Sequence, residues 1–424
     1  MARARRRGLV TDARTSLLLA AVPLVGAAIG LAWRGDPAAA RRWLLLVALA
    51  TGGVVAWAGT AGYVRGSDFV MAGLLAVGAF AVLLGQPARP GTAAPLLWTA
   101  ALLAAGVGAA AGDSWPPAAR LGVPLGLVAS LLFAYRSEAA RDPRPAIATA
   151  AIGALACLVA GSLPPPASAI ALLVAAGTAL PLFPLHAAYL GALTVLPGGL
   201  AAFVALLLPV VGFQGLAAIL PGLPAGSASA LEALALAGMA VGSFGALAAP
   251  RATAVVAYGT VAFLAIPWWF LAAGQLASGP AAVFAGAAAL AASGMLLALG
   301  IGQARSVGGG GRHAGGLAAA MPRFGVAFSL LAVAAMGLPP FGVFGGLLGM
   351  LLAPDLGWPG GIVAILLTWL AASWYLFDLA QASLFSGKAA PPPGDARPAE
   401  LAALYIVVAV LAILGVVPAG RLAG

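Results

Sequence analysis

Long apolar runs recur along almost the whole chain and decide what it can fold into. A helix needs about 20 apolar residues to cross a hydrocarbon core that is roughly 30 Å thick. About fourteen such runs lie between residues 15 and 418, in a chain that is 63% hydrophobic and 8% charged. The sequence therefore predicts an all-α polytopic membrane protein, whose first partner is the lipid bilayer.

The polar connections divide the chain into four parts. A basic tail covers residues 1–14, and a first group of transmembrane helices covers 15–165. We predict a transmembrane core over 166–390, followed by a linker and a C-terminal transmembrane helix over 391–424. No stretch is polar enough for a soluble domain. We therefore expect a multi-pass protein of a cell membrane, the inner membrane of a bacterium.

The net charge of +10 comes from basic residues that are scattered through the connecting loops. Nucleic-acid binding requires a clustered basic patch, so we expect no nucleic-acid partner. The arginines of the tail favour a cytoplasmic N-terminus, because positively charged flanks remain inside. Arg34, Arg41 and Arg42 lie in the next loop, on the opposite side, so the sequence leaves the orientation open.

Candidate ligands for a metal or cofactor are scarce. The single cysteine, Cys157, lies in an apolar run and is interpreted as a small packing residue. Neither a nucleotide-binding fingerprint nor metal-ligand spacing occurs, so we expect no cofactor and no metal site. The ten tryptophans, among them Trp268 and Trp269, are expected at the lipid interface.

Prolines interrupt two of the apolar runs. Pro339 and Pro340 lie in the run at 324–353, and Pro184 is one of two prolines in 181–186. Proline removes a backbone donor and clashes with the preceding helical turn, so both runs predict a broken helix. The run at 324–353 could also be a helix followed by a re-entrant piece. Backbone groups freed inside a membrane must be paired by protein or water, which makes such breaks candidate transport sites.

Three ionisable side chains lie within the predicted spans, and such groups are candidates for ion transport. His186 could relay protons near neutral pH or serve as a packing residue. Glu232 could carry protons or simply favour the N-terminal dipole of its helix. Asp378 could carry protons or reach water near its helix end. Tyr375 and Gln381 lie three residues before and after Asp378, and we expect the three on one polar helix face.

Several motifs resemble one family of membrane proteins. PLFPLH at 181–186, with Pro197 following, is similar to the PxHxWLP element of the antiporter-like membrane subunits of respiratory complex I, related membrane hydrogenases and Mrp-type cation/proton antiporters. Further similar elements follow in the family's order: Ala257-Tyr258, Gly316-Leu317, Met321-Pro322, Gly337 to Phe341 with Gly342 and Phe344, and Tyr375 to Gly387. The first 165 residues match only in hydropathy.

The resemblance implies a particular fold and role. It implies about fourteen helices with two inverted five-helix repeats, each containing a broken helix. It also implies movement of protons, or of protons against sodium ions, together with other membrane and peripheral subunits of a multi-subunit complex. One form of that role is a non-redox subunit of a NADH-quinone oxidoreductase-like complex.

The sequence departs from the family at its ionisable groups. Where the resemblance places such groups, this chain has Val210, Thr253, Ala254, Phe263 and Ser293. Its one lysine, Lys388, lies in a loop. Three interpretations stay open: a divergent proton-translocating subunit, a non-conducting structural subunit with the same fold, and an unrelated multi-helix solute transporter with a substrate-sized cavity.

Overall fold

The structure is a computed structural model in which every described element of regular structure is a helix. It describes residues 17–86, 93–110, 115–138, 142–224, 226–272, 279–305, 316–352, 359–385 and 394–417. The predicted basic tail and the loop with Lys388 lie outside these ranges. Within the ranges, the predicted all-α polytopic fold is confirmed.

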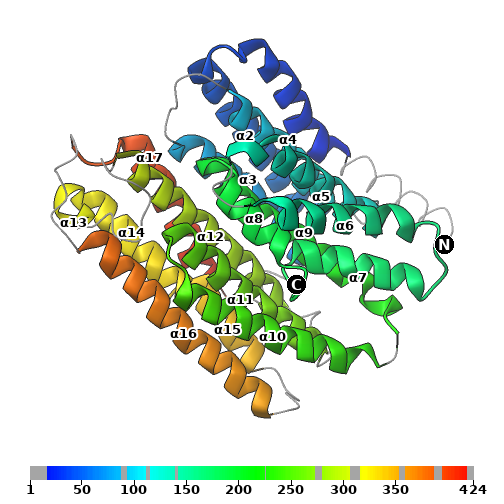
Figure 1. Cartoon of the computed structure of the whole chain (residues 1–424). Helices are drawn as coiled ribbons and strands as arrows, with labels where there is room; N and C mark the ends of the chain where they lie inside the picture. Colours follow the sequence, from blue (N-terminus) through cyan, green and yellow to red (C-terminus); the bar gives the residue numbers. More distant parts are fainter. Residues whose placement is uncertain are drawn as a thin grey trace.

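The helices follow one another along the chain as Figure 1 labels them. The first helix, Leu17–Trp33, precedes α2 (Pro37–Thr60) and α3 (Gly66–Gly85). Next come α4 (Ala94–Ala110), α5 (Pro117–Ala134), α6 (Arg144–Ala160), α7 (Ala167–Ala179), α8 (Ala187–Val195) and α9 (Gly198–Ile219). The remaining helices are α10 (Ser227–Ala248), α11 (Ala252–Ala272), α12 (Gly279–Arg305), the short α13 (Leu317–Ala320), α14 (Pro322–Ala335), α15 (Gly342–Leu351), α16 (Pro359–Leu384) and α17 (Pro398–Val416).

The described helices provide fourteen membrane spans. Nine helices are long and apolar enough to cross a membrane alone, and Leu17–Trp33, α4 and α6 are shorter apolar helices that add three. The last two spans are broken helices, formed by α7 with α8 and by α14 with α15. The run at 324–353 is therefore a broken helix, which decides between the two alternatives that the sequence left open.

Two sets of five spans have the same order of elements. Each set consists of three unbroken helices, a broken helix and a final helix, from α4 to α9 and from α10 to α16. In both sets the first helix contacts the second and the last, and the third helix contacts both halves of the broken one. Because five is an odd number of crossings, the second set starts from the opposite side of the membrane. The first set begins at Ala94, and the division of the chain at residue 166 stays a prediction.

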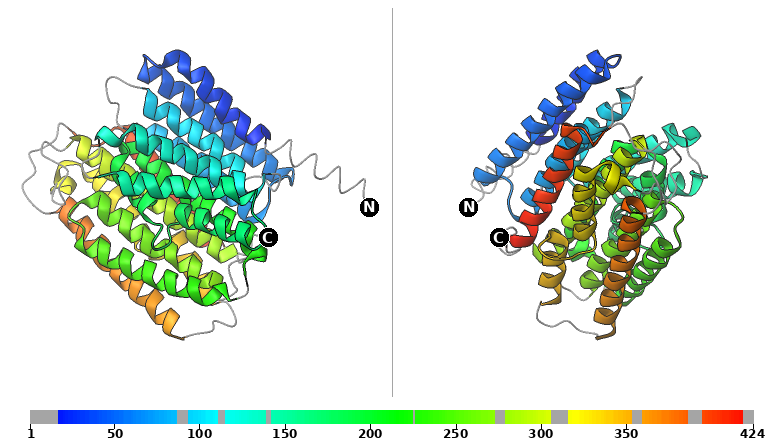
Figure 2. Two further views of the ribbon diagram at one scale, coloured as in Figure 1. Left: turned by 45° about the vertical axis from the view of Figure 1, so that its right-hand side comes forward. Right: turned by 90° about the vertical axis from the view of Figure 1, so that its left-hand side faces the viewer.

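The fold has a central apolar core, which α17 flanks on one side. Helices α9, α11 and α12 are buried along nearly their whole length, and they lie in the middle of the molecule in Figure 1. Helix α17 contacts α3 on one side and α12, α14 and α15 on the other. The right-hand view of Figure 2 shows it as the red helix between the blue N-terminal helices and the yellow second set. Helix α17 therefore joins the N-terminal helices to the second broken helix.

Several helices begin on a proline. The first helical position tolerates proline because its N–H would have no partner within the helix, and the ring already holds a helical φ. The helices that begin in this way are α2, α5, α14, α16 and α17. At the start of α2, the Asp36 carboxylate also accepts the Ala38 and Ala39 N–H groups, each at 3.0 Å. These local signals fix where many of the spans start.

Candidate functional site

The first helix break lies between α7 and α8. Pro184 stands four residues after Leu180, so it cannot supply the N–H that a continuous helix would donate to the Leu180 carbonyl. The indole N–H of Trp268, from α11, donates to that carbonyl oxygen at 3.1 Å instead. Gly212 of α9 faces the same segment, and a Cβ there would overlap the Leu180 backbone nitrogen. A neighbouring tryptophan and a neighbouring glycine thus hold the first break.

The second break, between α14 and α15, starts with a helix-ending turn. Gly337 has φ +72°, a left-handed conformation that glycine adopts without the steric cost of a Cβ. The Gly337 N–H donates to the Ala334 carbonyl at 3.1 Å, and the Leu338 N–H donates to the Val333 carbonyl at 3.3 Å. This pattern is a Schellman motif, which pairs carbonyls at a helix C-terminus.

Another tryptophan and another glycine hold the second break. Pro340 cannot donate to the Met336 carbonyl, and the indole N–H of Trp369 on α16 donates to it at 2.8 Å. Gly415 of α17 lies against the break, where a Cβ would overlap the Pro340 carbonyl oxygen. The two breaks therefore share one construction, in which an indole pairs a freed carbonyl and a glycine allows another helix to approach the backbone.

His186 is the ionisable group nearest to a break. It directly precedes α8, is partly buried, and lies over the Phe183 ring with the ring centres 5.8 Å apart. Its Nδ1 atom is buried and has no hydrogen-bond partner among the described residues. The predicted proximity of a histidine to a proline break is therefore present, while its part in proton transfer stays a prediction.

The predicted polar face of α16 is divided between two sides of the helix. Tyr375 is 1% exposed and points into the core, whereas Asp378 and Gln381 lie on the exposed side beside Trp374 and Phe377. The expectation of one shared face is wrong because each step of three residues turns a helix by about 300°. The second step therefore places Gln381 about 120° from Tyr375.

Glu232 is placed differently from the sequence expectation. It is the sixth residue of α10, so it lies beyond the first turn, where the helix dipole acts most strongly. Its carboxylate accepts the indole N–H of Trp269 at 3.3 Å. Trp268 and Trp269 are both buried, so the expectation that they mark the lipid interface is wrong. Their N–H groups find partners inside the protein, as buried indoles usually do.

Three hydroxyl groups lie where α8 of the first set contacts α11 of the second, and of these the sequence singled out only Tyr375. Tyr189 of α8 is fully buried, donates to the Ala205 carbonyl at 3.1 Å, and lies within hydrogen-bonding reach of Thr260 on α11. Thr260 and Tyr375 line one small cavity. Sequence periodicity could not find this group, because its members come from three helices that only the fold brings together.

Among the described residues, the central helices α9, α11 and α12 bury no acidic or basic side chain in their middle turns. Val210, Phe263 and Ser293, where the resemblance places ionisable groups, are all buried there. The buried charged side chains of the described chain are Arg120 and Glu400, both near helix ends. Among the same residues, no three His, Cys, Asp or Glu side chains lie close enough to hold a metal.

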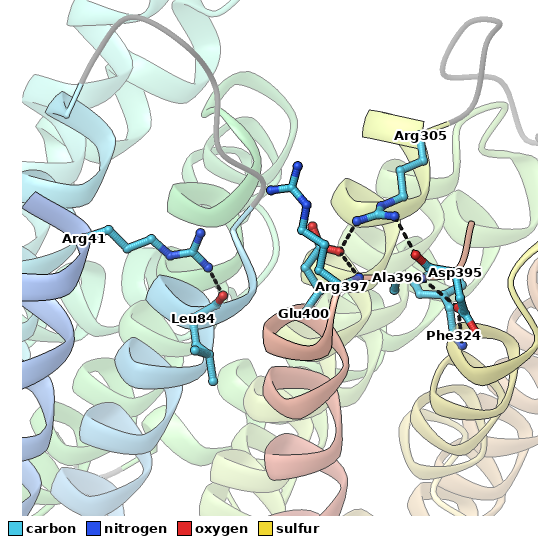
Figure 3. Close-up of polar contacts among 8 residues, drawn as sticks. All are labelled: Arg41, Leu84, Arg305, Phe324, Asp395, Ala396, Arg397 and Glu400. Atoms are coloured by element: carbon cyan, nitrogen blue, oxygen red, sulfur yellow. Dashed lines mark hydrogen bonds and ion pairs between the residues drawn. The ribbon is translucent and has the colours of Figure 1, made fainter. Parts of the chain in front are cut away.

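Glu400 belongs to a polar cluster that joins the ends of α12, α14 and α17, shown in Figure 3. Its carboxylate pairs with the Arg305 guanidinium and accepts the Arg397 N–H at 2.8 Å. Arg305 also donates to the Asp395 carbonyl at 2.8 Å, and the Asp395 carboxylate accepts the Phe324 N–H at 3.3 Å. Sequence reasoning missed this ion pair, whose partners lie 95 residues apart.

Basic residues gather at the end of the molecule that holds this cluster. Because successive spans alternate in direction, nine of the eleven arginines in the described residues lie there: Arg34, Arg41, Arg42, Arg136, Arg144, Arg251, Arg305, Arg323 and Arg397. Arg65 and Arg120 lie at the opposite end. Arg41 in addition donates to the Leu83 carbonyl at 2.7 Å and to the Leu84 carbonyl, which ties α2 to the end of α3 (Figure 3).

The fold and the two breaks define a class, the polytopic membrane proteins with inverted five-helix sets. The sequence matches no protein-family model and no curated protein. Solved structures with the same fold belong to respiratory complex I from Thermus thermophilus, with a TM-score of 0.73 at 21% identity over 96% of this chain and 98% of that one. The Mrp complex from Dietzia sp. DQ12-45-1b gives 0.74 at 15% identity, over 96% of both chains.

A third similar structure is the membrane-bound sulfane sulfur reductase, an archaeal respiratory membrane complex. Its TM-score is 0.80 at 17% identity, over 96% of this chain and 95% of that one. The match in each case covers nearly the whole of both chains, including the first 165 residues, whose sequence resembles the family only in hydropathy. The chain therefore has the fold of membrane subunits found in complex I-like and Mrp-type assemblies.

Proposed function

We propose that the chain is a membrane subunit of a multi-subunit ion-translocating assembly, of the complex I-like or Mrp-like kind, in a bacterial inner membrane. The observation that carries this proposal is the pair of proline breaks at equivalent places in two inverted five-helix sets. In such folds, half-helix ends near the middle of the membrane line the path of ions. The electron-transfer steps of a redox assembly would belong to its other subunits.

Within such an assembly, the geometry favours a structural role for this chain. The carbonyls of a helix break can coordinate an ion when they are free and face a hydrated path. Here the indoles of Trp268 and Trp369 occupy one such carbonyl at each break. The described middle turns of α9, α11 and α12 also bury no group that could hold a proton at neutral pH. The chain would then maintain the shape of the membrane arm while neighbouring subunits move ions.

One observation favours conduction as a second candidate function. The buried Nδ1 atom of His186 has no partner among the described residues, and it lies at the first break. A histidine in that position can accept and release protons. The proton pathway would then use His186 and Tyr375, with Glu232, Asp378 and Gln381 toward the ends, and would carry protons or exchange them for sodium ions.

The first experiment tests assembly. An affinity tag on the chain in its native host, followed by purification in mild detergent and mass spectrometry, should recover membrane and peripheral subunits in fixed stoichiometry. A tagged protein that purifies alone from intact membranes, with no loss of respiratory or antiport activity when its gene is deleted, would contradict the proposal.

The second experiment separates the two roles. We expect His186→Phe and Asp378→Asn to leave proton uptake by vesicles with the assembled complex unchanged, because a structural subunit holds no essential proton. The control is Phe385→Leu, which changes an exposed apolar side chain on the same surface as Asp378 and should leave protein yield and proton uptake unchanged. Loss of uptake with normal subunit composition, in His186→Phe but not in the control, would establish conduction instead.

A further inference from the structure

Four carbonyls lose their helical donors to the four prolines of the breaks. Each lies four residues before a proline: Gly177, Leu180, Ala335 and Met336. The Leu182 N–H donates to the Gly177 carbonyl at 2.9 Å. Trp268 and Trp369 donate to the carbonyls of Leu180 and Met336. For the fourth carbonyl, that of Ala335, the described residues supply no backbone or side-chain donor.

Ala335 borders a small cavity between α11, α12, α14 and α16. The cavity has a volume of about 20 Å³, and Thr260 and Tyr375 provide its polar side chains. Tyr375 reaches it because its ring lies against Gly259, where a Cβ would come within 2.8 Å of the phenolic oxygen. A water molecule needs at least about 10–15 Å³ of such space and two to four polar partners. The cavity meets both requirements for one water.

We propose that this cavity is a binding site for one ordered water molecule. The water donates one hydrogen to the Ala335 carbonyl and the other to the Thr260 hydroxyl oxygen, and it accepts the Tyr375 O–H. The Thr260 hydroxyl proton is already donated to the Val256 carbonyl at 2.7 Å, which leaves its oxygen as an acceptor. Every hydrogen-bonding group of the cavity wall then has a partner, as buried polar groups generally require.

Water fits this site better than a metal cation. None of the described residues that line the cavity is acidic, so a cation would lie uncompensated in an apolar interior at a large cost in free energy. The three oxygens available are also fewer than the six or more that Ca²⁺ and Mg²⁺ take. The site therefore selects a small neutral molecule that both donates and accepts hydrogen bonds.

The water would join three helices of the second set. Its hydrogen bonds connect Thr260 on α11, Ala335 at the end of α14 and Tyr375 on α16. The site depends only on the second break and the helices around it, so it goes beyond the proposed function and holds for either role of the subunit.

The test is a structure of the purified protein at a resolution that shows ordered water. We expect density about 2.7–3.2 Å from both the Ala335 carbonyl oxygen and the Tyr375 hydroxyl oxygen. Density should be weakened or lost in Tyr375→Phe, which removes one of three partners. An unoccupied cavity, in a map that shows other buried waters, would overturn the proposal, as would density with the five or six close oxygen ligands of a cation.

A double-mutant cycle provides a test that does not depend on resolution. Tyr375→Phe and Thr260→Val each remove one partner of the water, so we expect their effects on the midpoint of unfolding to be smaller together than the sum of the two. Val256→Ala, which alters the cavity wall without removing a polar side chain, should add to Tyr375→Phe without coupling. Strict additivity of the hydroxyl pair would show that no shared water links them.

Discussion

Trp369→Phe is the sharpest perturbation that the structure offers, because it removes one hydrogen bond from one helix break. The Trp369 indole donates to the Met336 carbonyl at 2.8 Å, and Pro340 excludes a replacement donor from the helix itself. Leaving a buried acceptor unpaired costs about 1–3 kcal/mol. Measured hydrogen bonds between membrane helices average about 0.6 kcal/mol and reach about 1.7. We therefore expect Trp369→Phe to lower the free energy of unfolding by about 1–2 kcal/mol.

Two matched variants make this expectation specific. Trp268→Phe removes the equivalent bond at the first break, and because Trp268 is fully buried it also leaves a cavity. We expect its total cost to be about 2–4 kcal/mol. Trp374→Phe is the control, since Trp374 lies on the same helix as Trp369 but is 73% exposed. Its effect should be close to zero.

The assay can use the protein's own cysteine. Cys157 is the single cysteine of the chain and is buried in α6, so a thiol-reactive dye should label it only when the protein opens. Equilibrium unfolding in mixed detergent micelles, followed by this labelling, would give the free energies. If Trp369→Phe unfolds at the same point as Trp374→Phe, the indole does not stabilise the break, and the structural interpretation of both breaks loses its main support.

Three further predictions follow from other contacts. Gly415→Ala places a methyl group against the Pro340 carbonyl and should lower the unfolding midpoint, whereas Gly126→Ala, with no neighbouring atom within 4 Å, should leave it unchanged or raise it. Glu400→Gln replaces the ion pair with Arg305 by a neutral hydrogen bond and should cost about 2 kcal/mol, while Asp142→Asn at an exposed pair should cost almost nothing in the same unfolding assay. The end of the molecule with nine arginines should face the cytoplasm. In a Cys157→Ser background, an impermeant thiol reagent added outside intact cells should label Ser162→Cys but not Arg251→Cys; the reverse pattern would invert the orientation.

The spans and the breaks could be predicted from the sequence because both depend on local chemistry. Apolar length determines where helices cross the membrane, and proline removes a donor wherever it stands. The sequence left two forms open for the run at 324–353, because it does not show whether the chain after Pro340 continues across the membrane or turns back. The order of the similar motifs also led to the fold that the solved structures share.

The candidate site was less predictable because its contacts join distant segments. Trp268 and Trp369 have the residue type of an interfacial anchor, and only the fold places their indoles on the carbonyls of α7 and α14. Glu400 stands in the first turn of α17, where a carboxylate is common for reasons of the helix dipole, so nothing local points to Arg305. The three-residue spacing predicted that Tyr375 and Gln381 share a helix face. The rotation of the helix over six residues instead places the two side chains about 120° apart.

The contact between Gly415 and Pro340 has a consequence for biosynthesis. Seventy-five residues separate the two positions, so the second break enters the membrane well before the helix that covers it. At synthesis rates of about 5–20 residues per second, that interval lasts roughly 4 to 15 s. During this time the nascent chain holds a bent, partly uncovered backbone within the lipid. Insertion of α17 is therefore the step that covers the second break, and chains that end before it should be preferred substrates for membrane proteases.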